Sequence, residues 1–404
     1  MVKTIRRFQK TSRVFFGALL GLALLSEPAG ATPLNPTSDG EIIEVLPGLT
    51  STRAQERRQR KMLAQQPRDP GLAIEIATRY LAQAHELGDP RFAGMAMAAI
   101  SGWTDEATMP DDVLMMRATL QQYLHEFDAS VRSLEVLVRR PSTVPRPQAW
   151  LTLATVRRVQ GRYGDSDLAC KKVATSVAAL HAEACLAENA GLRGEVDHAR
   201  AIFMRLLADA RLPASTQAWL TTSLAELEQR AGRADAADAA FRSALQTAPD
   251  AYTAVAYADF LIDQKRPLEV LDLLRQQARS DAVVLRLAIA GTQVAERAPG
   301  AISGASVDVD EMRERISLAN QRPDAKLFHG REQAMFALWV ERQPARALEL
   351  ARGNVAQQRE PLDLLVLAQT AHATGRPDAL QQVRRLMSQM GLRDERIAVI
   401  LGRG

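Results

Sequence analysis

Large rings and sheet-like alternation are scarce in this sequence. Phe, Trp and Tyr together make up 5% of its 404 residues, while 47% are hydrophobic, with Ala and Leu dominant. No run alternates β-branched with polar residues, so the pattern excludes a fold built on sheets. Small and aliphatic side chains pack closely between helices, and we therefore predict an all-α protein.

Catalytic and metal-binding motifs are absent as well. The sequence contains no HExxH, no GxSxG, no glycine-rich phosphate loop and no CxxC pair. Its six histidines are scattered without ligand spacing, and the stretch from Asp308 to Glu311 lacks the glycine and the terminal glutamate of a calcium loop. We therefore expect no enzyme activity, no cofactor, no small-molecule substrate and no metal site.

The start of the chain, from Met1 to Ala31, has the three parts of a secretory signal. A basic head runs from Lys3 to Arg13, an apolar run from Val14 to Leu25, and the small residues of a cleavage site end at Ala31. The apolar run is shorter than the ~20 residues that span a bilayer, although an uncleaved anchor stays an alternative. We expect cleavage after Ala31 and a periplasmic or secreted protein.

Removing this signal also removes the excess of positive charge. The whole chain has 51 basic and 47 acidic side chains, of which five and one, respectively, lie between Met1 and Ala31. The remaining chain is neutral, with 46 charges of each sign. Binding to nucleic acid would require a basic face, so we expect no nucleic-acid partner.

Residues 32–66 precede the regular part of the chain. The stretch from Thr32 to Leu49 is rich in Pro, Gly, Ser and acidic residues, and it is either an extended arm or a disordered spacer. The charged run from Arg53 to Lys61 predicts a leading helix that ends near Pro67. Its charges are expected in solvent rather than on a lipid surface.

Residues 217–250 contain two helical stripes joined by a turn. Apolar or small residues recur at helical spacing from Leu220 to Leu227 and again from Ala237 to Leu245. Gly232 supplies the turn because glycine tolerates a left-handed backbone, and Pro249 ends the second helix. This helical hairpin leaves an apolar face uncovered, so it needs a similar neighbour, which predicts an array.

The hairpin pattern recurs from Asp69 to the end of the chain. The predicted turns lie at Gly88, His125, Gly161, Gly194, Gly232, Lys265, Arg342 and Gly375. Their spacing is regular except for the step from Lys265 to Arg342, which is about twice as long as the others. That step contains an irregular hairpin at residues 281–320, with helices from Asp281 to Arg297 and from Asp310 to Asn320 and a long loop between them. A period in the mid-thirties with two helices per unit is typical of tetratricopeptide solenoids.

Individual positions also resemble the tetratricopeptide repeat family. The family has a Trp or Leu early in the unit, then Leu with Gly or Ala, Gly at the turn, and Ala, Phe, Ala and Pro in the second helix. Residues 217–250 match with Leu224, Ala225, Gly232, Ala237, Phe241, Ala244 and Pro249. Two earlier units match less fully, with Trp150, Leu153, Ala154, Gly161 and Tyr163, and with Leu186, Ala187, Gly194, Ala199 and Phe203. The match is weak at both ends of the array.

This resemblance implies a fold and a class of function. The fold is a right-handed α-solenoid, a superhelix of about nine antiparallel helix pairs over residues 67–404. The chain as a whole is similar to uncharacterised exported tetratricopeptide proteins of Gram-negative bacteria, and that likeness implies no activity. Members of the family hold ligands on the concave face of the superhelix, which is lined by the first helix of each pair.

The two cysteines lie on helices that touch in a stack of this family. Cys170 falls on the second helix of one hairpin and Cys185 on the first helix of the next. Export would place them where disulfides persist. The sequence leaves a structural disulfide and two buried thiols as equal alternatives, because it does not give the separation of the Cα atoms.

Seven residues are the candidates for a binding surface on the concave face. One predicted row has planar side chains and another has carboxylates: His181, Trp219, Tyr252 and His329, and then Glu188, Glu226 and Asp259. Together they suit an extended peptide with cationic side chains. The alternative is that Trp219 and Tyr252 pack between helices and that the acids are a solvated face.

We therefore expect a non-enzymatic scaffold or adaptor that binds a protein or peptide. No segment outside the repeats is long enough for a catalytic domain. The alternative function is a structural or self-associating component that supports a complex in the cell envelope.

The role of Phe241 gives a first testable prediction. If it fills the gap between neighbouring hairpins, Phe241→Ala should lower the free energy of unfolding by about 3–5 kcal/mol. In a one-dimensional stack, the loss should be felt mainly by the two adjacent hairpins. Hydrogen exchange measured peptide by peptide checks both points, and a loss spread evenly over the chain would contradict the second.

Overall fold

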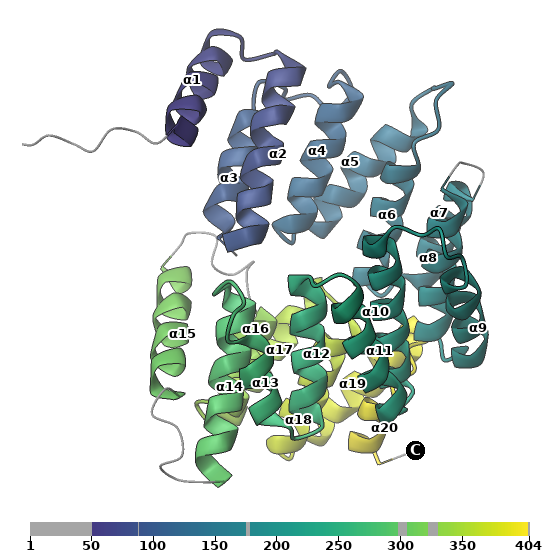
Figure 1. Cartoon of the computed structure of the whole chain (residues 1–404), viewed down its shortest axis with the longest axis vertical. Coiled ribbons are helices and arrows are strands. Elements are labelled where there is room, and N and C mark those ends of the chain that lie inside the picture. Colours follow the sequence, from purple (N-terminus) through teal and green to yellow (C-terminus); the bar gives the residue numbers. More distant parts are fainter. Residues whose placement is uncertain (1–50, 88, 175–177, 298–304, 322–329, 403–404) are drawn as a thin grey trace, which may run out of the picture. The chain divides into compact units, whose positions relative to one another are not determined.

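The structure is a computed structural model that describes residues 51–87, 89–174, 178–297, 305–321 and 330–402. These residues form twenty helices and no strand (Figure 1). No helix among them is long and apolar enough to cross a membrane. The predicted signal, the arm from Thr32 to Leu49 and the turn at Gly88 lie outside the described residues. The first described helix, α1 (Ser51–Gln65), spans the charged run for which a leading helix was predicted.

Nine helical hairpins follow α1 in the described part of the chain, and α20 (Glu395–Ile400) ends it. Each hairpin consists of two consecutive helices in contact. The pairs are α2–α3 (Pro70–Leu87, Pro90–Ala99), α4–α5 (Asp111–Tyr123, Phe127–Arg139), α6–α7 (Pro147–Val159, Tyr163–Val173), α8–α9 (Ala179–Leu192, Val196–Leu207), α10–α11 (Ala214–Arg230, Ala234–Thr247), α12–α13 (Ala251–Asp263, Pro267–Leu274), α14–α15 (Asp281–Arg297, Ala305–Asn320), α16–α17 (Gly330–Trp339, Pro344–Gln357) and α18–α19 (Pro361–Ala373, Pro377–Met390).

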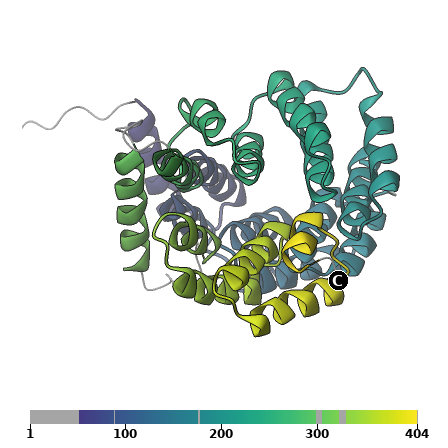
Figure 2. The same ribbon diagram turned by 90° about the horizontal axis from the view of Figure 1, so that it is seen from below.

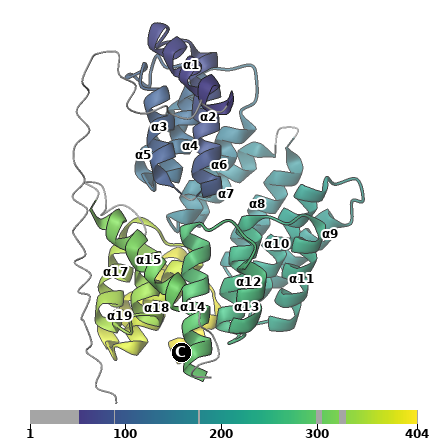
Figure 3. The ribbon, with the colours of Figure 1, turned by 60° about the vertical axis from the view of Figure 1, so that its left-hand side comes forward.

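The hairpins stack through their first helices. From α2 to α18, the first helix of each hairpin contacts the first helix of the next, and Figure 3 shows α8, α10 and α12 side by side. Small side chains allow neighbouring helices to approach closely: Ala225 on α10 and Ala237 and Ala244 on α11 have no exposed surface. Phe241 is also fully buried, with its ring centroid 5.4 Å from that of Tyr257 on the next hairpin. The prediction of an all-α solenoid of antiparallel helix pairs is confirmed.

The turns of the hairpins share one backbone conformation. Gly161, Gly194, Gly232 and Gly375 have positive φ angles, and so do three residues with side chains, His125, Lys265 and Arg342, at φ of 60°, 58° and 57°. At Lys265 the chain closes the helix end with a bond from Arg266 N–H to the carbonyl of Leu261, at 2.9 Å. The left-handed turn is therefore required at every one of these positions, whichever residue occupies it.

The irregular hairpin differs from the prediction at one boundary. Its first helix, α14, spans Asp281–Arg297, but its second helix, α15, begins at Ala305 and not at Asp310. Asp308 therefore lies in the first helical turn, where a negative charge is favourable, and it forms an ion pair with Arg279 at 2.7 Å. The residues from Ala305 to Val309, which looked like loop, thus form the start of this helix.

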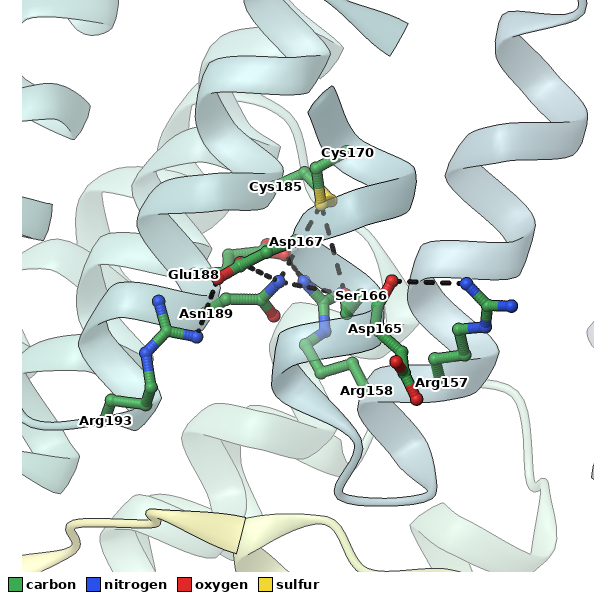
Figure 4. Close-up of a disulfide and its surroundings, with 10 residues drawn as sticks. All are labelled: Arg157, Arg158, Asp165, Ser166, Asp167, Cys170, Cys185, Glu188, Asn189 and Arg193. Atoms are coloured by element: carbon green, nitrogen blue, oxygen red, sulfur yellow. Dashed lines mark hydrogen bonds and ion pairs between the residues drawn. A yellow bond between two sulfur atoms is a disulfide. The ribbon is translucent and has the colours of Figure 1, made fainter. Parts of the chain in front are cut away.

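A disulfide joins two adjacent hairpins (Figure 4). Cys170 of α7 and Cys185 of α8 are bonded, with their Cα atoms 5.9 Å apart. Asn189 lies beneath the bond and donates from Nδ2 to Ser166 Oγ at 2.9 Å and to Asp167 Oδ1 at 2.8 Å. Because both cysteines are buried, the bond fixes the register of these two hairpins from inside.

The end of the chain folds back onto the middle hairpins, which the repeat pattern did not predict (Figure 2). Arg359 N–H donates to the carbonyl of Val159 at 2.7 Å, and Arg393 N–H donates to that of Leu192 at 2.8 Å. Val159 and Leu192 are the last residues of α6 and α8, whose carbonyl groups lack partners within the helix. We call residues 391–394, between α19 and α20, the clasp.

The strained turn at Lys265 gives a second prediction. Lys265→Gly should raise the free energy of unfolding by about 1 kcal/mol, because a side chain in the left-handed region costs about 1–2 kcal/mol. The matched control is Lys171→Gly, another exposed lysine but inside α7, which should lose about 1 kcal/mol. Urea titration of both variants checks the opposite signs, and a loss at Lys265 would contradict the interpretation of the turn.

Candidate functional site

The first helices of the middle hairpins line a cavity of about 500 Å³. Its wall comes from α6, α8 and α10, with Tyr163 of α7, Tyr252 of α12 and the segment Glu360–Pro361. The hydrogen bond from Arg359 to Val159 holds that segment at the cavity. The site is therefore built by four successive hairpins and one distant stretch of chain.

Planar side chains form one part of the wall. The rings of His181 and Trp219 are stacked, with centroids 5.6 Å apart and planes at 20°. Trp219 is 37% exposed and Tyr252 is 66% exposed, although both line the cavity. These two rings are thus available to a ligand and are not packed in the core between helices.

Carboxylates form another part of the wall, and arginines match them. Glu188 forms an ion pair with Arg158 and accepts a hydrogen bond from Ser223 Oγ at 2.9 Å. Asp259, which lines the adjoining cavity described below, accepts two hydrogen bonds from Arg286, at 2.8 and 2.7 Å. Two parallel hydrogen bonds make this the strong form of an arginine–carboxylate ion pair, so Arg286 occupies the Asp259 carboxylate. The acids are therefore not a free solvated face.

Glu226 differs because its ion pair is loose. Its distance to Arg230 is 3.9 Å, while Tyr252 donates a hydrogen bond to its Oε1 at 2.6 Å. Burial raises the pKa of Glu226, and the negative charge of Glu226 raises the pKa of Tyr252 well above its ordinary value. Two buried polar atoms nearby, Arg230 Nε and the hydroxyl of Tyr163, have no hydrogen-bond partner among the described residues. Glu226 and Arg230 are thus the charged groups of this wall with capacity left for a ligand.

An adjoining cavity of about 260 Å³ continues the first one. Asp259, Arg286 and Arg396 line it. Arg396 also contacts Asp263 at 3.4 Å. Burial raises the pKa of Asp263 to about 6, although the charge of Arg396 acts in the opposite direction.

The structure places the predicted residues as follows. Five of the seven line the first cavity, namely His181, Glu188, Trp219, Glu226 and Tyr252, and Asp259 lines the second. His329 lies outside the described residues. Their role in binding stays a prediction.

Sequence reasoning missed the arginines. Arg158, Arg230 and Arg286 neutralise or approach the predicted acids, and only Glu226 and Arg230, four residues apart on one helix, could have been paired from spacing. The other two pairs cross from one hairpin to the next, over 30 and 27 residues. The equal numbers of acidic and basic residues after Ala31 indicated that such pairing would occur, but they did not identify the partners.

Comparison with known proteins gives only distant likenesses. No protein-family model matches the chain, and no curated protein matches it in sequence. Among solved structures, a Rap protein complexed with competence and sporulation factor is 12% identical, with 87% of this chain and 90% of that chain covered at a TM-score of 0.46. Yeast Tom70 is also 12% identical, with coverages of 86% and 83% and a TM-score of 0.29. Both scores are below 0.5, so the description of the fold depends on the helix pairing in this chain.

The raised pKa of Asp263 gives a third prediction. A folded-state pKa of about 6, above the unfolded value of about 3.9, means that the proton stabilises the fold; this stabilisation is complete below about pH 4 and is lost as the pH rises through 6. The free energy of unfolding of the natural chain, relative to Asp263→Asn, should therefore fall by about 2–3 kcal/mol between pH 4 and pH 7.5.

Urea titrations at several pH values measure this difference. The control is Gln264→Ala, which changes the neighbouring exposed residue without removing a titrating group and should give a profile parallel to that of the natural chain. A constant difference between Asp263→Asn and the natural chain would contradict the prediction.

Proposed function

We propose that this protein is a non-enzymatic scaffold that binds an extended segment of a partner protein along the first helices of its middle hairpins. The observation that carries the proposal is the exposure of Trp219 and Tyr252 inside a cavity. The two rings occupy corresponding places on successive hairpins, α10–α11 and α12–α13. Exposed rings provide large contact area at little cost in side-chain entropy, and a repeated spacing suits a ligand that is itself extended.

The charges of the cavity wall indicate which side chains the bound segment carries. The sequence suggested that three carboxylates would recognise cationic side chains, but Glu188 and Asp259 are held by arginines. Glu226 is the acid that a cationic side chain of the ligand can approach, because its own arginine is 3.9 Å away. A ligand cation at this place would offset the burial of the Glu226 carboxylate. The proposed segment therefore has an apolar or aromatic side chain next to a single lysine or arginine.

The proposed location is the periplasm. The signal-like stretch from Met1 to Ala31 supports export, and the disulfide between Cys170 and Cys185 supports a compartment in which such bonds persist. A partner would then be an exported protein or an exposed segment of an envelope protein.

The fourth prediction tests the rings. On an array of random short peptides, the natural chain should bind a subset, and Trp219→Ala combined with Tyr252→Ala should weaken binding of that subset by at least about tenfold, since aromatic residues in a pocket are typical hot spots. The matched control is Leu168→Ala with Met204→Ala, two residues that are 60% and 57% exposed but line neither cavity.

Three outcomes decide between the functions. If both double variants lose peptide binding equally, or if neither loses any, the proposed role of the cavity in binding is refuted. Retained binding with lost preference for Lys and Arg in Glu226→Gln would support the ligand proposed above. Light scattering of the natural chain at several concentrations provides the remaining check, because a growing mass would favour a self-associating structural component.

A further inference from the structure

A second kind of cavity lies where the clasp meets the turns of the middle hairpins. It has a volume of about 750 Å³ and is lined by the turns of α8–α9 and α10–α11 on one side and by α19, the clasp and α20 on the other. We call the cavity that contains Trp219 and Tyr252 the ring-lined cavity. Arg230 is the one residue that lines both cavities. The site is therefore distinct from the proposed peptide surface.

The wall of this cavity is rich in arginine. The middle hairpins contribute Arg193, Arg230 and Arg233, and the end of the chain contributes Arg384 and Arg393. The two carboxylates among the lining residues belong to Asp394 and Glu395. Asp394 is buried and forms an ion pair with Arg396 at 2.7 Å, so it does not neutralise the five.

The two sides of the cavity fit each other through arginine and glycine. A Cβ atom on Gly194 would lie 2.8 Å from Cγ of Arg393, and one on Gly391 would lie 3.7 Å from Cγ of Arg193. Each arginine stem thus lies over the glycine of the opposite side. This arrangement brings Arg193 and Arg393, which come from distant parts of the sequence, to the same wall.

Three of these cations have carboxylate partners and two do not. Arg193 forms ion pairs with Asp167 at 3.0 Å and Glu195 at 3.6 Å, and Arg233 with Asp197 at 2.8 Å and Glu228 at 3.7 Å, while Arg230 lies 3.9 Å from Glu226. In contrast, Arg384 and Arg393 form no ion pair within the described part of the chain, although Arg384 donates to the carbonyl of Leu401 at 2.6 Å. Arg230 has a buried Nε without a partner.

Arg384 and Arg393 bring to this cavity two positive charges that no carboxylate of the described residues offsets by an ion pair. Guanidinium groups suit oxyanions with several oxygen atoms, because the planar fork donates two parallel hydrogen bonds to carboxylate or phosphate. An anion with two negative charges would balance these two arginines, and the volume admits a small molecule. We propose that this cavity binds a compound with a diphosphate or two phosphate groups, either free or as a lipid headgroup.

Such an anion would also fasten the clasp. It would contact arginines on both sides at once, so its binding energy would add to the bond from Arg393 N–H to the carbonyl of Leu192. Hydrogen exchange of residues 390–401 should become slower when the anion is bound.

The experiment titrates the chain with inorganic pyrophosphate by calorimetry at low ionic strength, with vesicles containing cardiolipin, a lipid with two phosphate groups, as a second arm. Binding of either probe should weaken at least about tenfold in Arg384→Gln combined with Arg393→Gln, because two charge-assisted contacts are lost. The matched control is Arg385→Gln, which removes the adjacent exposed arginine that does not line the cavity and should bind as the natural chain does.

The outcomes separate the possibilities. Pyrophosphate binding that depends on Arg384 and Arg393 assigns a free anion, and binding of vesicles alone with the same dependence assigns a headgroup. Absence of binding by both probes, or equal loss in Arg385→Gln, would overturn the proposal. Sodium chloride at matched ionic strength should reproduce neither the binding nor the slower exchange of the clasp.

Discussion

The uncovered apolar face of each hairpin is the constraint on which this structure depends. Two helices of about a dozen residues cannot bury their own apolar stripe, so each pair is stable only against the next. Alanine at the contacts lets neighbouring helices approach closely, as Ala225 on α10 and Ala237 on α11 show by their complete burial. The left-handed turn between paired helices keeps the stack regular, and three non-glycine residues adopt that turn at a cost in backbone energy because the stack requires it.

Stacking also decides the chemistry of the inner wall. First helices that lie side by side bring their inner residues together whether their charges suit one another or not. Carboxylates close to low-dielectric walls would be costly, and arginines from neighbouring hairpins offset that cost at Glu188 and Asp259. The Glu226–Arg230 pair is looser because both residues come from α10 and Tyr252 competes for the carboxylate. The place where a ligand can gain most is therefore the place where the array satisfies its own charges least.

The sequence predicted what is periodic and missed what is not. Turn positions followed from the period, including His125, Lys265 and Arg342, where the residue type alone would not indicate a turn. The period also brought five of the predicted inner residues to one cavity, while Asp259 lines the adjoining cavity and His329 lies outside the described residues. The predicted start of α15 was wrong, and Asp308 in the added first turn forms an ion pair with Arg279, a residue outside that helix. The clasp could not be predicted, because no repeat relates Arg393 to Leu192.

The clasp changes how this solenoid should respond to stress. In an open stack, each hairpin senses only its neighbours, and damage stays local. Here the carbonyl ends of α6 and α8 are bonded to Arg359 and Arg393, so the middle hairpins and the end of the chain support each other although they are far apart in the sequence. Arg230 lines both the ring-lined cavity and the arginine-rich one. A ligand that moves this side chain in one cavity changes the charge presented to the other, and by linkage the two sites must then influence each other equally.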